Sequence, residues 1–549
     1  MQFNLAQVFA AVAAANPDRD CIVFGDRRLT YARTDERARR FARALHKWGM
    51  GAHRERSGLA PYESGQTHLG LYMANCNEYL EAMLGAYKAR VAPFNVNYRY
   101  VADELVYLLD NARAEAVMYH ARFAPTLGEA LGRMPGPIRL IHVDDGSGHD
   151  PLPGAVRYEE LLAGESDEPL DVVPSPDDLY ILYTGGTTGM PKAVLWRQHD
   201  IYLNAMGGRN FGTGEEATSL EEIVERSRPE GPGSMTVAPL MHGAAQWAAF
   251  INLCGGRPFV MPATTTHFDA AEAWALAARE RVVSMSMVGD AFGRPLLDAL
   301  EAGGPSLREQ LSGFLILITG GAALSAPLKN RFVELLPQLT ILDAGGASES
   351  GSQMGQVSSR AQDASGRFAP NPGAVVVSAD MTRILSPGDD EIGWLAQQRL
   401  IPLGYLGDPE KTARTFPVIE GIRHSVPGDR ARWHADGQIE LLGRDSVTIN
   451  SGGEKIFAEE VEAALLRHPA VYDAVVTSRP STRWGNEVVA VVQVADGARP
   501  DADGILAEAA RHIARYKLPK AIVFRDRVQR SPSGKADYRW AKEQAGQAN

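Results

Sequence analysis

Short apolar, β-branched runs alternate with stretches of helical periodicity rich in Ala, Leu and Arg along most of this chain. That alternation predicts an α/β fold, with layered sheets that contain substantial parallel pairing. The expected strands include Ala116–Tyr119, Arg139–Val143, Met235–Ala238, Val282–Val288 and Leu315–Thr319. The expected helices include Glu36–Trp48, Asp103–Asp110, Ala270–Glu280 and Ala326–Leu336. Between residues 372 and 403 short strands and Gly/Pro turns take over, which indicates a β-rich subdomain.

The 549 residues are too many for one hydrophobic core, so the chain is expected to form at least two domains. A boundary near Gly443–Ser446 divides it into a large domain, residues 1–445, and a small one, residues 446–549. The small domain reads as a mobile α+β unit. Its expected elements are a helix Ala458–Arg467, strands Val471–Ser478 and Val488–Val494, a helix Ala502–Arg515 and a strand Ala521–Phe524.

Composition excludes several classes of protein. The net charge of −11 argues against nucleic acid as the main partner, and the three cysteines have no disulfide or zinc spacing. No apolar run reaches the 18 residues that a membrane-spanning helix needs. The apolar stretch Val8–Ala15 lacks a preceding basic region, so it indicates an amphipathic helix and not a signal peptide. A cytoplasmic location is expected.

The stretch from Thr184 to Lys192 combines three glycines, three threonines and a lysine between two strand-like runs, Leu179–Tyr183 and Val194–Trp196. Glycines let backbone amides approach a polyphosphate, and the lysine adds positive charge. This is not a Walker A loop, because Pro191 precedes the lysine and a strand follows it. The pattern predicts a phosphate loop between two strands; the alternative is a flexible Gly/Thr hairpin.

Six further segments place chemistry-bearing side chains beside small residues or turns. They are Ala238–Gly243 with His242, Thr319–Ala322, Asp343–Glu349, Gly404–Thr412, Gly428–Arg444 continuing into Ser451–Glu462, and Pro532–Lys535. Alone, His242 would be read as a structural histidine and the Lys535 segment as a surface tail. Gly404–Thr412 is either a structural turn or a ligand contact.

In this order and spacing, the segments resemble the AMP-forming adenylate enzymes: acyl-CoA synthetases, peptide-synthetase adenylation domains and firefly-type luciferases. Trp196–Gln198, His242–Trp247 and Asn450–Lys455 are most similar to actinobacterial fatty-acid and sterol-side-chain acyl-CoA ligases. The resemblance implies that ATP activates a carboxylic acid as an acyl-adenylate, which coenzyme A then captures. It also implies Mg²⁺ as the metal cofactor.

The resemblance assigns roles to residues of this chain. Lys535, His242 and Glu349 are the expected catalytic residues, with Glu349 also the Mg²⁺ ligand. Ser446 occupies the hinge position, where the family usually has a charged residue. The expected nucleotide and phosphate contacts are Thr184, Gly185, Gly186, Thr187, Thr188, Gly189, Lys192, Gly321, Ala322, Asp343, Ala344, Ser348, Asp429 and Arg444.

Gly345 departs from the family pattern, which has a tyrosine stacked on adenine at this position. Stacking of a base on an aromatic ring contributes roughly 1–3 kcal/mol. Either another side chain takes this place or the nucleotide binds more weakly. Asp343 is expected to accept a hydrogen bond from the adenine amine.

Several points stay open at the level of sequence. The chain could load a carrier protein in place of CoA, act as a luciferase-like oxygenase, or be a catalytically silent relative. A lipid-like acid is favoured, and Met285, Met287 and Val288 could line its pocket or simply form a core strand. The oligomeric state is open and includes a homodimer.

Overall fold

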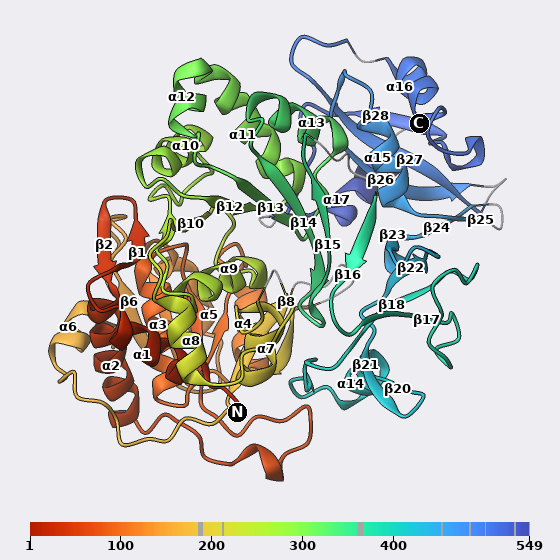
Figure 1. Cartoon of the computed structure of the whole chain (residues 1–549). Helices are drawn as coiled ribbons and strands as arrows, with labels where there is room; N and C mark the ends of the chain where they lie inside the picture. Colours follow the sequence, from red (N-terminus) through yellow and green to blue (C-terminus); the bar gives the residue numbers. More distant parts are fainter. Residues whose placement is uncertain are drawn as a thin grey trace.

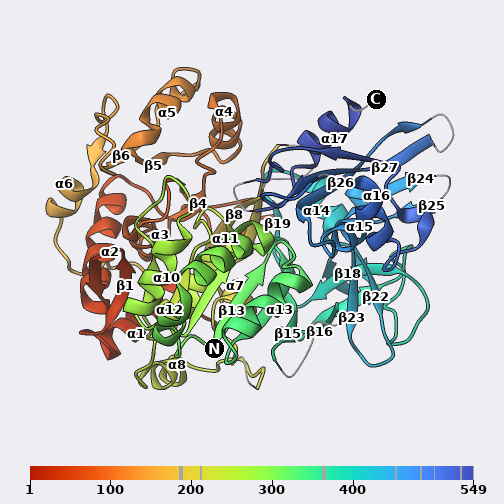
Figure 2. The same cartoon turned by 90° about the horizontal axis from the view of Figure 1, so that it is seen from above.

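The computed structural model of the chain describes residues 1–184, 190–210, 213–360, 366–451, 454–481, 485–499, 501–531 and 534–547. These residues form a mixed α/β structure with a large N-terminal part and a smaller C-terminal part, drawn in blue (Figure 1). The expected α/β fold class is confirmed. Figure 2 shows the C-terminal elements beside β22 and β23, and α15 contacts β23.

The phosphate loop is attached to an eight-stranded sheet in the described chain. Its order is β19 (Gly404–Tyr405), β9 (Lys192–Arg197), β8 (Leu179–Thr184), β4 (Ala92–Asn95), β3 (His68–Tyr72), β5 (Ala116–His120), β6 (Arg139–Val143) and β7 (Val156–Arg157). β8 and β9 are antiparallel, and Thr184 pairs with Lys192. A loop between two strands is therefore confirmed, and both of its ends are held by one hairpin.

A second sheet of 15 described strands runs from the N-terminus to the β-rich region. Its parallel part is β1 (Asp20–Phe24), β11 (Phe259–Met261), β10 (Ser234–Thr236), β12 (Ser284–Met287), β13 (Ile316–Gly320) and β14 (Thr340–Ala347), with β2 (Arg27–Thr30) at the edge. Its antiparallel part is β15 (Gly351–Ser358), β16 (Arg367–Pro370), β23 (Ile439–Arg444), β22 (Asp429–Trp433), β18 (Gly393–Gln398), β21 (Ile422–Ser425), β20 (Val418–Ile419) and β17 (Ala374–Val377). The switch from parallel to antiparallel pairing occurs at β14, next to the segment that carries Glu349.

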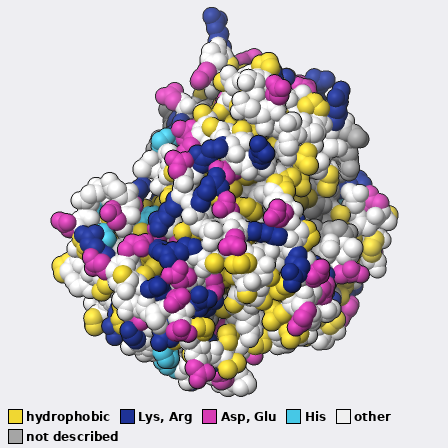
Figure 3. Space-filling view, turned by 60° about the vertical axis from the view of Figure 1, so that its left-hand side comes forward, with side chains coloured by type: hydrophobic (Ala, Val, Ile, Leu, Met, Phe, Trp, Pro, Cys, Tyr) yellow, Lys and Arg dark blue, Asp and Glu magenta, His cyan; other side chains and the backbone are white. Residues whose placement is uncertain are grey.

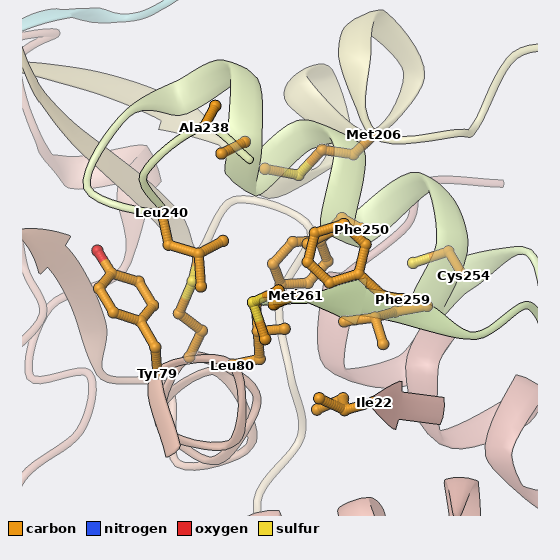
Figure 4. Close-up of a cluster of buried hydrophobic side chains, with 14 of the residues drawn as sticks. Ile22, Tyr79, Leu80, Met206, Ala238, Leu240, Phe250, Cys254, Phe259 and Met261 are labelled. Carbon is orange, nitrogen blue, oxygen red and sulfur yellow. The ribbon is translucent and has the colours of Figure 1, made fainter. Parts of the chain in front are cut away.

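Helices pack against both sheets (Figure 1). They are α1 (Leu5–Ala15), α2 (Tyr31–Lys47), α3 (Asn77–Lys88), α4 (Ala102–Asn111), α5 (Ala124–Leu131), α6 (Tyr158–Ala163), α7 (Gln198–Ala205), α8 (Leu220–Ser227), α9 (Gly243–Cys254), α10 (Ala270–Arg279), α11 (Gly289–Ala302), α12 (Gly304–Gln310), α13 (Ala326–Leu335) and α14 (Pro409–Thr415). Figure 4 shows Leu80 of α3 and Phe250 of α9 meeting Met261 of β11 in the main buried cluster. Burial of such side chains contributes about 1.5–3 kcal/mol each.

The small domain has its own sheet, formed by β26 (Val471–Ser481), β27 (Gly485–Val494) and β28 (Ala521–Phe524), and a hairpin of β24 (Ile449–Ser451) and β25 (Glu454–Ile456). Its helices are α15 (Ala458–Leu465), α16 (Ala502–Ala509) and α17 (Tyr538–Gly546). Valines of β26 and β27 fill two apolar clusters on the two faces of this sheet.

Two expected helices differ from the observed ones by more than two residues at one end. The expected helix Glu36–Trp48 begins earlier, at Tyr31, because the Thr30 side chain caps it by accepting from the Arg33 amide. The expected helix Ala502–Arg515 was too long. It ends at Ala509, its last buried residue, and Ala514 is extended before a short turn, Arg515–Lys517.

Surface charge is mixed in sign. On the face in Figure 3, Lys and Arg side chains are interspersed with Asp and Glu. Opposite charges on the surface form ion pairs such as Arg28–Glu280 and Arg33–Glu36. This face has no extended basic surface of the type that nucleic acid binding requires. Among the described residues, no helix has both the length and the apolar composition needed to cross a membrane.

Candidate active site

A cavity of about 1430 Å³ lies between the large domain and the small one. Its large-domain wall includes Thr184 at the end of β8, one face of α9, and the carboxyl ends of β12, β13 and β14. Residues from Lys535 to Lys542 close it from the small domain. Carboxyl ends of parallel strands are the usual place for ligands in open α/β sheets, so the topology itself positions this cavity.

Lys535 enters the cavity from the small domain. A Cβ atom placed on Gly321 would lie 3.7 Å from Lys535 Cε, so the lysine side chain passes over the Gly321 turn. Atoms of both domains enclose the ammonium, and this enclosure lowers its pKa; Arg444 lowers it further, while Glu349 and Asp429 oppose the shift. The structure thus brings Lys535, Glu349, Asp429 and Arg444 into one electrostatic group.

The neighbouring Gly534 explains how the lysine reaches this place. Its φ of +73° is in the left-handed region, and a Cβ there would lie 3.0 Å from the Val288 carbonyl oxygen. Glycine lets the small-domain backbone dock directly against the start of α11. The adjacent Pro532 and Ser533 lie outside the described residues.

Glu349 is held in place by two contacts. The Tyr405 hydroxyl donates to Glu349 Oε1 over 2.8 Å, and Ser425 Oγ donates to the Glu349 carbonyl. The preceding Ser348 carbonyl accepts from Trp196 Nε1 at 2.8 Å, and Ser348 itself lines the cavity. Ordered backbone on both sides preorganises the carboxylate for a ligand.

Asp429 and Arg444 face each other across the β22–β23 ladder. Arg444 Nε lies 3.2 Å from Asp429 Oδ1, and Asp429 is the main cause that raises the Arg444 pKa. The Arg444 amide also donates to Glu459 Oε2, on α15 of the small domain, over 3.2 Å. Arg444 therefore contacts both domains, two residues before Ser446. The backbone of Ser446 is in the short turn Asp445–Val447, and its side chain lies outside the described part of the structure.

His242 lines the same cavity at the N-terminus of α9. Burial, together with the positive charges of Lys535 and Arg99, lowers its pKa to about 3. The imidazole is therefore neutral near pH 7. Its Nε2 atom is enclosed and has no hydrogen-bond partner among the described residues, so it can serve a bound ligand.

The other residues expected to contact the nucleotide or its phosphates do not all line the cavity. Thr184, Gly321 and Ala344 line the cavity, whereas Ala322 packs behind it against Gly289. Lys192 Nζ lies 3.5 Å from Asp408 Oδ2 beside the loop. Five expected loop residues, Gly185, Gly186, Thr187, Thr188 and Gly189, lie outside the described part of the chain, as do Gly452 and Gly453.

Asp343 has a partner that the sequence did not indicate. Its Oδ2 atom lies 2.7 Å from Nζ of Lys329 on α13, and both side chains are buried. Burial raises the Asp343 pKa, and the lysine works against this. Leu342 and Ala344 on either side line the cavity, but Asp343 does not. The ion pair gives Asp343 a structural role, and its contact with an adenine amine stays a prediction that this geometry does not favour.

Comparisons with known proteins agree with this arrangement. The AMP-binding enzyme family matches residues 9–395, and the AMP-binding enzyme C-terminal domain matches residues 460–535. The chain belongs to the AMP-binding enzyme family. It is 54% identical over 545 residues to the medium-chain acyl-CoA ligase Mig of Mycobacterium avium, with 99% of this chain and 98% of the relative covered.

A second relative and one solved structure are similar to the chain over nearly its whole length. A 3-oxocholest-4-en-26-oate–CoA ligase of Rhodococcus rhodochrous is 39% identical, with 100% of this chain and 96% of the relative covered. The ATP-bound structure of MatB from Rhodopseudomonas palustris superposes with a TM-score of 0.80 at 22% identity, covering 99% of each chain. That likeness shows that the chain shares the fold of this structure over both domains.

The sequence did not indicate several residues that line this cavity. Met354 of β15 is one: it pairs across the ladder with Gly345, and a Cβ on Gly345 would lie 2.7 Å from Met354 Cγ. Met354 thus fills the space beside the glycine.

Another group of cavity-lining residues that the sequence did not indicate is Trp247, Ala248 and Ile251 of α9. Their helical spacing was visible in sequence, but which face of α9 meets the cavity depends on the packing around it. Met287 and Val288 line the cavity, and Met285 belongs to the core.

Proposed function

We propose that this chain is an AMP-forming acyl-CoA ligase that activates a lipid-like carboxylic acid and transfers it to coenzyme A. The observation that carries the proposal is the position of Lys535, which reaches from the small domain to the group formed by Glu349, Asp429 and Arg444. A catalytically silent relative would not need this geometry, whereas a carrier-loading ligase forms the same adenylate and differs only in the acceptor of the second step. The full-length similarity to a medium-chain acyl-CoA ligase supports the same activity.

In the first step a carboxylate oxygen attacks the α-phosphorus of ATP, the bond to the β-phosphate oxygen breaks, and pyrophosphate leaves. Two anions must meet, so catalysis depends on positioning and charge neutralisation. Lys535 is the residue we assign to the charge that develops between the carboxylate and the α-phosphate. Asp429 suits the ribose hydroxyls, since a carboxylate accepts two hydrogen bonds. The neutral His242 can donate to or accept from the acid.

Mg²⁺ fits the residues that are present. Glu349 supplies one fixed carboxylate, and the described residues contain no cluster of three or more His, Cys, Asp or Glu side chains that would suit a metal cage. Mg²⁺ typically takes one or two protein carboxylates and completes its octahedron with phosphate oxygens and water. Bound there, the ion would neutralise phosphate charge.

In the second step the CoA sulfur attacks the acyl carbonyl carbon, and AMP leaves. Lys535 fills the cavity from the small-domain side, so we propose that residues 446–549 rotate away from residues 1–445 to admit the thiol. Ser446 is the proposed hinge, in the turn that directly follows Arg444. ATP and CoA are both available in the cytoplasm, where we place the reaction.

The acid-binding part of the cavity is proposed to lie along α9. One face of this helix, with Gly243, Trp247, Ala248 and Ile251, lines the cavity, while Phe250 and Leu253 face the core. A mostly apolar wall suits an alkyl or ring-containing acid. A medium-chain fatty acid is the first candidate, since that is the acid class named for the 54% identical relative.

The test is a product assay with the purified full-length chain, ATP, Mg²⁺ and CoA. Medium-chain, long-chain, sterol-side-chain and aromatic acids are supplied one at a time, and AMP, pyrophosphate and thioester are quantified. We expect thioester and AMP in equal amounts, with apolar acids preferred. Adenylate without thioester, followed by transfer to a phosphopantetheine carrier, would instead identify a carrier-loading ligase. Absence of pyrophosphate release with every acid would overturn the proposal.

A further inference from the structure

Two lysines from different parts of the large domain meet beside the phosphate loop. Lys192 begins β9, and Lys411 lies in α14, within the segment Gly404–Thr412. Both ammonium groups lie near the ring of Tyr405: Lys411 Nζ is 4.6 Å and Lys192 Nζ is 6.0 Å from its centroid. Tyr405 is buried, and its hydroxyl is bonded to Glu349. The ring therefore fixes both cations relative to the proposed Mg²⁺ ligand.

The charges in this cluster do not balance. Asp408 is the near anion, 3.5 Å from Lys192, and its other oxygen accepts from the Lys411 amide as the cap of α14. Glu349 faces the cluster too, but it also faces Lys535 and Arg444. Burial and the adjacent Lys192 lower the pKa of Lys411 to about 8. Placing two cations together in partly buried surroundings is unfavourable unless an anion joins them.

The anion that suits this arrangement carries several charged oxygens. Two ammonium groups offer several donors in different directions, and a single carboxylate such as Asp408 occupies few of them. A polyphosphate would relieve the repulsion between the lysines and bond to both. The location agrees with this, because Lys192 pairs in register with Thr184, which lines the cavity.

We propose that Lys411, acting with Lys192, binds the β- and γ-phosphates of ATP and holds the pyrophosphate that leaves. This inference rests on the proposed function. When the bond between the α-phosphorus and the β-phosphate oxygen breaks, negative charge grows on that oxygen. Lys411 is thus a phosphate-binding residue on the leaving-group side, opposite the side on which the carboxylate attacks, and the adenosine and acyl contacts do not involve it.

The test compares Lys411→Gln with two matched variants of the full chain. Lys411→Arg keeps the charge, and Arg414→Gln removes a charge from an exposed position on the same helix. Binding of inorganic pyrophosphate with Mg²⁺ is measured by calorimetry, which needs no turnover. The KM values for ATP and pyrophosphate are then taken from pyrophosphate exchange, and thioester formation is followed from preformed acyl-AMP and CoA. A melting curve verifies that each variant is folded.

We expect Lys411→Gln to weaken pyrophosphate binding and raise the KM for ATP by about 10- to 100-fold, the usual effect of losing a charged hydrogen bond. Lys411→Arg should retain most of the pyrophosphate affinity and of the KM for ATP of the unsubstituted chain. Arg414→Gln should change neither the pyrophosphate affinity nor the KM for ATP. The thioester half-reaction should be unaffected in all three. Unchanged pyrophosphate affinity in folded Lys411→Gln, or an equal loss in Arg414→Gln, overturns the inference. Failure of the unsubstituted chain to form any adenylate would instead overturn the proposed function.

Discussion

At the scale of the residue, Lys535 shows how position changes chemistry. A lysine near the C-terminus of a chain is usually fully hydrated, yet this one lies among Glu349, Asp429 and Arg444. Enclosure disfavours its charged form, and the two carboxylates restore part of that loss. The pKa of Lys535 therefore lies below that of an exposed lysine, and its charge is lost at lower pH.

We predict a pH profile from this shift. Because the pKa of Lys535 is lowered, kcat/KM for ATP should fall as pH rises, beginning below the ordinary lysine range. Lys535→Arg keeps its charge to higher pH, so any activity that it retains should not show this decline. Lys535→Met should lower adenylate formation roughly 100- to 1000-fold and spare thioester formation from acyl-AMP. Equal loss of both half-reactions would contradict the assigned role.

Gly345 and Met354 form a second residue-scale case. The family tyrosine is missing, and the Met354 side chain fills the space into which a side chain at position 345 would project. Met354 also packs with Val376 and Leu395 in the core of the β-rich region. The glycine is therefore explained by its cross-strand neighbour.

We predict that Gly345→Tyr alone raises the KM for ATP, because the ring and Met354 cannot share this space. In the Met354→Ala background the same tyrosine should lower the KM for ATP again. The coupling free energy between the two substitutions should be about 0.5–3 kcal/mol. Steady-state kinetics of both single variants and of the double variant measure this coupling free energy. Additive effects would show that Met354 does not occupy the place of the tyrosine.

At the scale of the element, α9 separates two environments. Ala245, Ala249, Phe250 and Leu253 face the core, and the opposite face lines the cavity at helical spacing. His242 precedes the first turn, so the same helix positions a polar group at one end of an apolar wall.

We predict that Ala248→Trp shortens the accepted acid. The indole would fill cavity volume next to Trp247 and Ile251, so kcat/KM for long-chain acids should fall about 10- to 200-fold while short acids are retained. Ala248→Ser adds little volume and serves as the control. A chain-length profile identical to that of the unsubstituted enzyme would place the acid elsewhere.

At the scale of the whole molecule, side chains of the two domains contact each other at several described places. The Arg294 guanidinium of α11 lies 4.5 Å from the centroid of the Tyr472 ring in β26, and Arg444 bonds to Glu459. Such a cation–π contact contributes about 0.5–2 kcal/mol. That is enough to bias a domain equilibrium without locking it.

We predict that Tyr472→Leu slows pyrophosphate exchange roughly 2- to 30-fold, because the arrangement with Lys535 in the cavity becomes less populated. Thioester formation from acyl-AMP should not slow. Tyr516→Leu, at an exposed position of the same domain, is the control. Ser446→Pro should give the reverse pattern, since proline restrains the proposed hinge. If Tyr472→Leu slowed both half-reactions equally, the contact would have only a general stabilising role.

The sequence by itself determined the α/β layers, the strands on both sides of the phosphate loop, and the family. These depend on local signals: β-branched runs, helical periodicity, and glycines placed next to single charged residues. The resemblance, which short contiguous motifs carry, singled out Lys192, Glu349, Asp429, Arg444 and Lys535 as expected site residues.

Only the tertiary structure decided which side chains meet. Asp343 pairs with Lys329, Met354 fills the space beside Gly345, and Lys411 joins Lys192 on the Tyr405 ring. Each of these contacts joins different elements of the chain. Strand pairing and helix packing set such contacts, and both depend on residues that lie far apart in the sequence. The physical reason is that motifs encode what a residue can do, whereas its partners, burial and pKa follow from the elements that fold around it.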